Sequence, residues 1–179
     1  MAALYDAQRK YSQAEPLYRQ ALAEVQQRLG PEDQEAALVL NNLARLYANT
    51  GRHTEAISHF QRALVIWEKA LGPDHPYVAR ALTNLAGLYC SKNRLAEAEP
   101  LFRRALAIAE NALGPDNPLV AKILAEYSVL LRKTRRKTEA RSLERRAQTI
   151  RASYANQDLA RHTVDASDLL TARDRRSAK

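Results

Sequence analysis

The amino-acid sequence predicts an all-α protein built from tandem, antiparallel helical hairpins, and three observations support this prediction. The tripeptide Leu-Gly-Pro occurs at residues 29–31, 71–73 and 113–115, a constant spacing of 42 residues that indicates a tandem repeat. Only five glycines are present, three of them in these tripeptides, and the Ala, Leu, Arg and Glu-rich composition favours helices over strands. Within each copy, large and small apolar residues alternate at fixed positions, as closely crossing helices require.

Alignment of the copies at the 42-residue spacing shows this alternation position by position. One position is alanine in every copy, and two others hold large residues in most copies. The aligned sets are Ala14, Ala56, Ala98 and Ala140; Tyr18, Phe60, Phe102 and Glu144; and Tyr5, Tyr47, Tyr89 and Leu131. A single hairpin of this kind cannot bury its apolar faces alone, so neighbouring copies must stack.

Each copy is expected to contain a first helix and a second helix. The predicted first helices cover 34–50, 76–91 and 118–133, and the predicted second helices cover 12–28, 54–71, 96–113 and 138–153. The glycine of each Leu-Gly-Pro tripeptide can adopt the left-handed conformation that ends a helix, and the proline stops it from continuing. Asp74 and Asp116 follow at the place where a side chain could cap the next first helix.

The repeat register divides the chain into one elongated array. The predicted units are a partial first repeat at 1–28, full repeats at 29–70, 71–112 and 113–154, a degenerate capping helix at 155–172 and a tail at 173–179. Asn156 aligns with Gly114, and asparagine can adopt the left-handed conformation that glycine adopts at a helix end. The chain opens in the middle of a first helix, so we expect either a fragment of a longer array or an open N-terminal repeat.

The repeat resembles a known family. The motif residues are Leu43, Ala44, Tyr47, Ala56, Phe60 and Ala63, which together resemble the tetratricopeptide repeat (TPR). The 42-residue unit carries LGPDHP at 71–76, NNLA at 41–44 and RAL at 62–64, and looks like the variety found in kinesin light chains and nephrocystin-3. The resemblance covers residues 2–150 and implies a right-handed α-solenoid, the TPR superhelix. It also implies a non-enzymatic adaptor or scaffold that binds protein partners.

The sequence offers no catalytic or metal-binding constellation, so we predict neither an enzyme nor a cofactor or metal. The four histidines are scattered, and none of their spacings places two ligands on one helical face. No glycine-rich phosphate loop or nucleophile elbow occurs. A single cysteine, Cys90, excludes an internal disulfide and favours a reducing compartment. With no long apolar run and no signal-peptide pattern, the predicted location is the cytoplasm.

The candidate binding surface is the polar side of the first helices, opposite their buried stripe. Helical periodicity of about 100° per residue places a set of amides and cations there. The candidate peptide-binding residues are Asn41, Asn42, Arg45, Asn49, Arg80, Thr83, Asn84, Lys122, Arg132 and Lys133. In a TPR superhelix this side lines the concave groove, and the resemblance of NNLA to the kinesin light chain groove implies recognition of short peptides.

The residue types indicate what such a groove would bind. Asparagine is a poor interior helix residue, yet its amide can both donate to and accept from an extended peptide backbone. Five of the candidate residues are cations, and Glu126 is the single acid counted among them. We therefore expect an acidic peptide, attracted by the positive field. The alternative interpretation is that these polar residues are simply solvated.

Two further interpretations compete with the groove. Residues 132–179 contain 14 basic and 6 acidic residues, whereas residues 1–131 contain 14 of each, so the net charge of +8 comes from the C-terminal quarter. The basic run from Arg132 to Arg151 is either a solvated cap or an electrostatic site for nucleic acid, acidic lipid or an acidic protein. Nucleic acid is disfavoured because no aromatic residues interleave with the cations. The open N-terminal repeat could also mediate self-association.

Overall fold

The computed structural model describes residues 1–156, and within them the chain forms helices and turns without strands. The helices are α1 Ala2–Ala7, α2 Tyr11–Leu29, α3 Gln34–Asn49, α4 His53–Leu71, α5 Pro76–Ser91, α6 Leu95–Leu113 and α7 Pro118–Lys133, followed by a last helix over 137–156. The predicted ranges of the first and second helices agree with these bounds to within one residue for α2 to α7. Beyond its first two residues, the predicted capping helix at 155–172 lies outside the described part, as does the predicted tail at 173–179.

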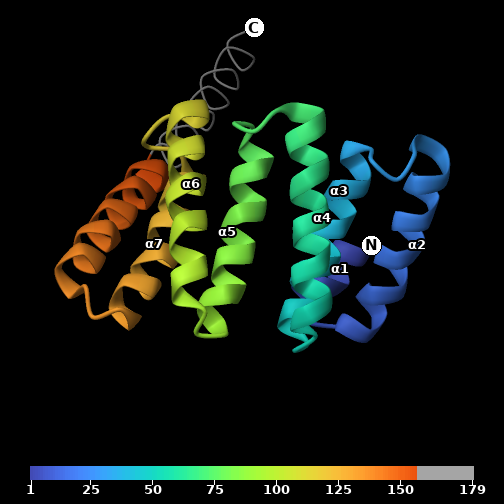
Figure 1. The fold of residues 1–179 in the computed structure, drawn as a ribbon, viewed down its shortest axis with the longest axis horizontal. Coiled ribbons are helices and arrows are strands. Elements are labelled where there is room, and N and C mark those ends of the chain that lie inside the picture. The colour runs from blue at the N-terminus through green and yellow to red at the C-terminus, as the bar shows by residue number, and fades with distance from the viewer. Residues whose placement is uncertain (157–179) are drawn as a thin grey trace, which may run out of the picture.

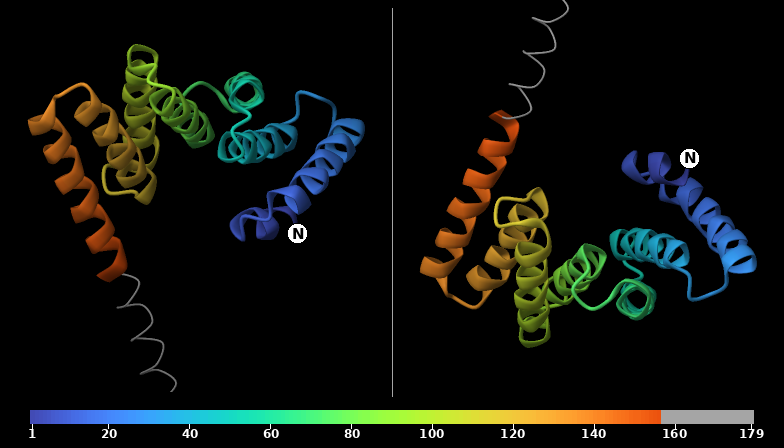
Figure 2. Two further views of the ribbon diagram at one scale, coloured as in Figure 1. Left: turned by 90° about the horizontal axis from the view of Figure 1, so that it is seen from below. Right: turned by 90° about the horizontal axis from the view of Figure 1, so that it is seen from above.

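The helices pair into antiparallel hairpins that stack in chain order along the long axis (Figure 1). Each helix packs mainly against its neighbours in sequence, and the first helices also contact one another from repeat to repeat, α3 with α5 and α5 with α7. The stack bends into an arch, with α3 on the inner side and α4 on the outer side (Figure 2). This arrangement confirms the all-α solenoid that the repeat predicts.

The core runs through the array along the aligned positions. Ala14, Ala56, Ala98 and Ala140 are each 0% exposed, which lets the partner helices approach closely. Phe60 and Phe102 fill the space beside them and are also buried. Trp67 is fully buried and stacks on Tyr77 of the next repeat, with ring centroids 5.3 Å apart. Fully burying a large apolar side chain contributes about 1.5–3 kcal/mol, so these positions hold the repeats together.

The Leu-Gly-Pro turns use a conformation open to glycine alone. Gly30, Gly72 and Gly114 all have positive φ, as expected, but their ψ values of 158–161° differ from those of a left-handed helix. This extended, positive-φ region is essentially restricted to glycine. The proline that follows accounts for the difference, because the residue before a proline is driven away from helical ψ.

A second kind of turn joins the two helices of each hairpin and repeats a left-handed residue every 42 positions. Gly51 takes this place in one repeat, with φ 82°. In the other hairpins the aligned residues are Arg9, Asn93 and Arg135, with φ 58°, 60° and 63°. A side chain in this conformation costs roughly 1–2 kcal/mol relative to the right-handed region. The arginines are therefore strained where glycine would not be.

The helix caps differ from the prediction by one residue. Asp33, His75 and Asn117 are the N-caps of α3, α5 and α7, and each side chain accepts a hydrogen bond from a backbone N–H two residues later. The expectation that Asp74 and Asp116 cap these helices is wrong. Proline occupies the first position of α5 and α7, where its fixed φ suits a helix start, and this sets the cap at the residue before it.

The last helix also runs further than its repeat register predicts. Residues 137–156 are helical, so Asn156 continues the helix and does not adopt a left-handed cap. The aligned Gly114 ends α6 because glycine precedes proline there, whereas Asn156 is followed by glutamine. Without the proline, nothing in the local sequence forces the helix to stop at this point.

Candidate functional site

Two adjoining depressions cross the first helices, and we call them together the first-helix groove. One, of about 260 Å³, lies over α3 and α5, and the other, of about 300 Å³, lies over α5 and α7. Both are lined by Gly87, Ser91 and Glu126, so they are continuous. Phe60 and Phe102 contribute to their apolar parts. The lining of the groove is mainly apolar, with a few polar side chains in it, among them Asn49, Asn84 and Glu126.

Gly87 marks the point where the two depressions meet. Its aligned residues are Arg45 in α3 and Val129 in α7, both of which are exposed. A Cβ atom added to Gly87 would lie 3.2 Å from Oε2 of Glu126, tighter than ordinary van der Waals contact. The missing side chain therefore lets Glu126 of α7 lie against the backbone of α5.

Amides and a lysine link the three first helices across the groove. Nδ2 of Asn84 donates to Oδ1 of Asn41 at 3.0 Å, and Nζ of Lys122 approaches Oδ1 of Asn84 at 3.5 Å. Asn84 is half-buried, whereas Asn41 is 0% exposed and its Nδ2 lacks a hydrogen-bond partner. Asn84 is thus the accessible amide of this pair, and its hydrogen bond to the buried Asn41 holds it in place.

The expectation that Asn41 and Thr83 line the exposed groove is wrong. Both are 0% exposed, and the Thr83 hydroxyl donates to the backbone carbonyl of Ala79 in its own helix at 2.7 Å. These two residues occupy aligned positions and face the seam between neighbouring first helices, where α3 contacts α5 and α5 contacts α7. Asn49 is exposed and lines the α3–α5 depression, and Asn42 is half-buried.

Three of the five candidate cations form ion pairs with acids, which is more than the sequence suggests. Arg45 forms an ion pair of 2.5 Å with Asp6 of α1, and Arg132 forms one of 2.5 Å with Glu144 of the last helix. Lys122 lies 3.8 Å from Glu126. The expectation of a single acid near five cations is therefore wrong, because Asp6 and Glu144 enter from neighbouring elements.

Two of the candidate cations, Arg80 and Lys133, form no ion pair with an acid among the described residues. Arg80 is half-buried and lies over the Tyr77 ring, 5.6 Å from its centroid. Lys133 donates to the backbone carbonyl of Cys90 at 2.9 Å and also lines the α5–α7 depression. The candidate cations without an ion pair therefore lie on α5 and α7 rather than on α3.

Glu126 is the acid at the centre of the groove. Burial raises the pKa of its carboxyl above the ordinary value, and the charge and hydrogen bonding of Lys122 oppose that rise. The carboxylate of Glu126 would repel a negative charge that a guest brought near it. Glu126 therefore limits how acidic a guest can be at this point.

Two clusters of charged residues that join neighbouring hairpins were not predicted from the sequence. Glu15 of α2 accepts from Arg52 and Tyr47 of the next hairpin, at 2.8 and 3.2 Å. Glu99 of α6 accepts from Arg136 and Tyr127 in the same way, at 2.6 and 3.0 Å. The hydrogen bond from Arg136 is the main reason that the pKa of Glu99 falls to about 2. The 84-residue spacing of the two glutamates and the two arginines is the signal that could have revealed these inter-repeat clusters.

The basic C-terminal run is partly neutralised. Arg136 pairs with Glu99 and Glu139, and Arg146 pairs with Glu110 at 2.5 Å. A separate depression of about 330 Å³ is lined by Arg132, Lys137 and Arg141. Within this cationic depression Arg132 pairs with Glu144, whereas Lys137 and Arg141 form no ion pair among the described residues.

Neither metal chemistry nor a membrane span is indicated within residues 1–156. That part of the chain contains no group of three or more potential His, Cys, Asp or Glu metal ligands. None of its helices is long and apolar enough to cross a membrane. Cys90 is buried.

Comparison with protein families places the repeat in context. A tetratricopeptide repeat profile matches residues 35–111 and 83–153, and a second profile of this repeat matches residues 1–32. These matches cover more than half of the chain, so it belongs to the tetratricopeptide repeat family. Repeats of this family generally bind other proteins. A comparison with curated protein sequences finds no match.

Several solved structures have a similar fold. BtubC (BKLC) from P. vanneervenii is similar with a TM-score of 0.76 and 26% identity over 86% of this chain, which spans 61% of that protein. Two structures of a Podosopora anserina putative kinesin light chain with nearly identical TPR-like repeats, one of them a variant, also match. Their TM-scores are 0.68 and 0.65 at 24% identity, covering 87% and 86% of this chain and 73% and 72% of theirs. These likenesses show that the chain shares the fold of these proteins.

Proposed function

We propose that the first-helix groove binds an extended, acidic peptide segment of a partner protein. The observation that carries this proposal is the position of Asn84, an accessible amide in the middle of the groove whose orientation is fixed by Asn41 and Lys122. An oriented carboxamide can donate to and accept from a peptide backbone whatever its side chains are. The apolar parts beside Phe60 and Phe102 would accept the side chains of the guest.

The charge distribution supports an acidic guest at one end of the groove. Arg80 and Lys133 lack acidic partners among the described residues, and Lys122 is only loosely paired with Glu126. Arg45 and Arg132 contribute less, because each has a close carboxylate. We therefore expect the acidic residues of the peptide to lie over α5 and α7, and less charged residues over α3.

A peptide-array experiment tests this proposal. The purified chain is applied to arrayed extended peptides in acidic, neutral and basic versions of the same backbone. Binding should favour the acidic versions and should be lost in a variant that combines Arg80→Ala and Asn84→Ala. Arg62→Ala is the matched control, because Arg62 is an exposed arginine on α4 and therefore lies outside the first helices that carry the proposed binding surface. Equal binding of acidic and neutral peptides, or unchanged binding by the double variant, would rule the proposal out.

A second candidate function is the electrostatic binding of a polyanion by the basic C-terminal run. The supporting observation is the cationic depression lined by Arg132, Lys137 and Arg141. Charge reversal of Lys137 and Arg141 should abolish binding to heparin, a generic polyanion, and wild-type affinity should fall steeply with salt. Arg146 is unsuitable for this test because Glu110 holds it in an inter-repeat ion pair. Self-association through the first repeat stays a prediction, which light scattering at two concentrations checks.

A further inference from the structure

The first repeat leaves uncovered a face that the later repeats bury. Met1 and Leu4 are 83% and 54% exposed, at one end of the arch (Figure 2). At the 42-residue spacing they align with residues of the later first helices, none of which is more than 7% exposed. The aligned residues are Leu43, Leu85 and Tyr127 for Met1, and Leu46, Leu88 and Leu130 for Leu4. We call Met1, Leu4, Tyr5 and Lys10 the open face, and within residues 1–156 no preceding second helix covers it.

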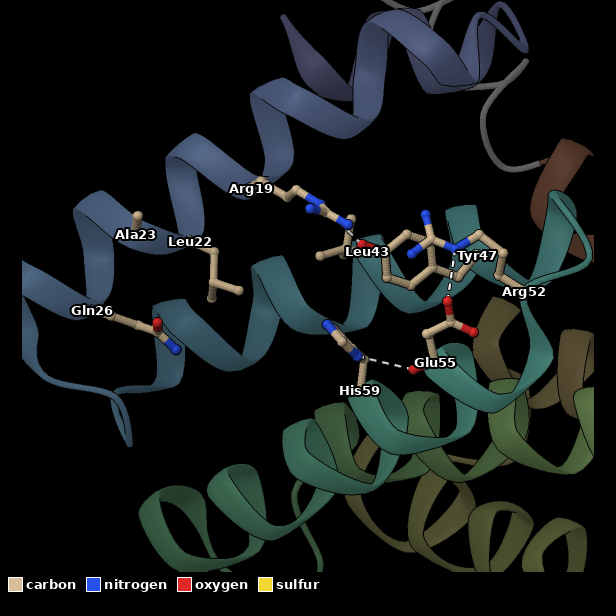
Figure 3. A pocket seen from close by; sticks show the side chains of 9 residues that line it. All are labelled: Arg19, Leu22, Ala23, Gln26, Leu43, Tyr47, Arg52, Glu55 and His59. Carbon is tan, nitrogen blue, oxygen red and sulfur yellow. Dashed lines mark hydrogen bonds and ion pairs between the residues drawn. The ribbon is translucent and has the colours of Figure 1, made fainter.

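The joint between α2 and the next hairpin shows how such a face is covered (Figure 3). Leu43 and Tyr47 of α3 and Arg52 at the start of α4 lie opposite α2, which presents Arg19 and Leu22 to them. The residues aligned with Leu43, Tyr47 and Arg52 are Met1, Tyr5 and Lys10. In the covered joints, therefore, the second helix of the preceding repeat closes this face.

Two residues of the covering helix make its polar contacts. Glu15 accepts from Tyr47 and Arg52, at 3.2 and 2.8 Å. Nε of Arg19 donates to the same tyrosine hydroxyl at 3.2 Å. The joint between α6 and the following hairpin repeats all three contacts with the residues 84 positions later, which are Glu99, Tyr127, Arg136 and Arg103. Both covering helices thus carry a glutamate followed four residues later by an arginine, a spacing that places the two side chains on one helical face.

Lys10 takes the place of Arg52 in the first repeat but lacks both of its acids. Lys10 precedes α2 with φ −84° and ψ 63°, and Arg52 precedes α4 with φ −82° and ψ 65°, so the two backbones present their side chains alike. Arg52 pairs with Glu15 of the preceding helix and with Glu55 of its own helix. The residue aligned with Glu55 is the uncharged Gln13. Lys10 is exposed and forms no ion pair within residues 1–156, so its charge is free to meet a carboxylate from a partner.

The joint between α4 and the following hairpin shows why an acid on the covering helix matters at Lys10. In that joint Ile57 of α4 stands where the other covering helices have glutamate. The aligned arginine, Arg94, pairs instead with Glu97 of its own helix at 2.5 Å. Apolar contact closes this joint because its cation already has a partner. Lys10 has no such partner, so a covering helix with a carboxylate complements the open face better than a purely apolar one.

A second copy of this chain has no free helix of the required kind among its described residues. Glu15 of α2 and Glu99 of α6 are both engaged in the joints of their own array. The last helix is polar on the face where a further repeat would pack. It has Glu144, Gln148 and Arg151 where α4 has Phe60, Leu64 and Trp67. The occupant is therefore expected to come from another protein.

We propose that the open face binds an amphipathic helix of another protein that presents a glutamate followed four residues later by an arginine. The glutamate accepts from Lys10 and Tyr5, the arginine donates to the Tyr5 hydroxyl, and apolar residues of the helix lie on Met1 and Leu4. Helix α6 has this arrangement in the sequence AEPLFR at 98–103, so the second helix of another tetratricopeptide array has the required chemistry. The open face contains no residue of the first-helix groove, and the two surfaces can act independently.

Fluorescence anisotropy with a synthetic peptide that copies α6, residues 95–113, tests the proposal. The labelled peptide should bind the full chain saturably, with one peptide per chain. A Glu99→Lys peptide should bind the wild-type chain about fivefold more weakly, and the wild-type peptide should bind a Lys10→Glu chain with a similar loss. The Glu99→Lys peptide and the Lys10→Glu chain together should recover the lost affinity, because the reversed charges again attract.

Substitution of Leu4 tests the apolar part of the open face. Leu4→Asp should weaken binding of the wild-type peptide about tenfold or more, because a leucine side chain is no longer buried on binding. Leu4 and Lys10 are exposed, so both variants should keep the wild-type melting temperature. Val65→Asp is the matched control, since Val65 is a 61% exposed apolar residue on α4. Asn84→Ala should also leave binding unchanged, because Asn84 lies in the first-helix groove.

Four outcomes would overturn the proposal. They are absence of binding by the α6 peptide, equal binding of the wild-type and Glu99→Lys peptides, undiminished binding by Leu4→Asp, and failure of the paired charge reversals to recover affinity. Light scattering by the chain alone examines the occupant. A concentration-dependent dimer that is lost in Leu4→Asp would mean that a second copy covers the open face, and the inference of a helix from another protein would be wrong.

Discussion

The side chain of Asn84 donates to the side chain of Asn41 across the boundary between α5 and α3, at 3.0 Å. One partner is buried and the other is accessible, so a residue that no ligand can touch sets the orientation of a residue that a ligand can touch. The pair is an example of a surface group whose geometry is fixed by the layer beneath it.

Asn41→Ala should therefore weaken peptide binding without a large loss of stability. The lost hydrogen bond costs about 0.5–1.5 kcal/mol, but the substitution also removes an unpartnered buried Nδ2, which offsets part of that cost. We expect the free energy of unfolding in urea to change by less than about 1 kcal/mol. Affinity for the acidic peptides should fall, since Asn84 loses its support. Wild-type affinity in Asn41→Ala would contradict this account.

Arg135→Gly should stabilise the protein. Arg135 has φ 63° at a position where another repeat has glycine. Relief of the left-handed strain gains roughly 1–2 kcal/mol, and the entropy of an added glycine costs about 0.5–1 kcal/mol, so a net gain of up to about 1.5 kcal/mol is expected. Urea denaturation measures it. Asn93→Gly is the control and should gain less, because asparagine tolerates this conformation.

Glu99→Gln should remove part of the acid sensitivity of the fold. The pKa of Glu99 lies at about 2 in the folded chain, against an ordinary value of 4.5. The unfolded chain therefore binds this proton first as pH falls, and the stability that Glu99 contributes is present above about pH 4.5 and is lost as pH falls toward 2. Unfolding free energies measured between pH 7 and 2 should decline less steeply in Glu99→Gln. Glu24→Gln, a change at an exposed glutamate of α2, should leave the slope unaltered.

The periodicity of the sequence predicts the helices well because each helix depends on local spacing and on its own repeat. The groove is harder to predict, since its electrostatics depend on residues from other elements. Asp6 lies 39 positions before Arg45 in the sequence and belongs to α1. A helical wheel of α3 therefore cannot show that these two residues pair. Burial of Asn41 and Thr83 was missed for a similar reason. A periodic pattern separates the buried stripe from the opposite arc, but the contact between successive first helices covers part of that arc.

Glu126→Gln should strengthen the binding of acidic peptides to the groove. Glu126 is the carboxylate at the junction of the two depressions, and its removal leaves Lys122 without an acid at 3.8 Å, free to face the guest. Burial raises the pKa of this carboxyl, so the neutral amide resembles its protonated form and should fit without rearrangement. Affinity for the acidic peptides, measured by fluorescence anisotropy, should rise in the variant, and the gain should shrink as salt increases. Binding of neutral peptides serves as the control and should change little. A weaker acidic interaction in Glu126→Gln would instead mean that the carboxylate accepts a hydrogen bond from the guest, which would place the peptide backbone, and not its acidic side chains, over α7.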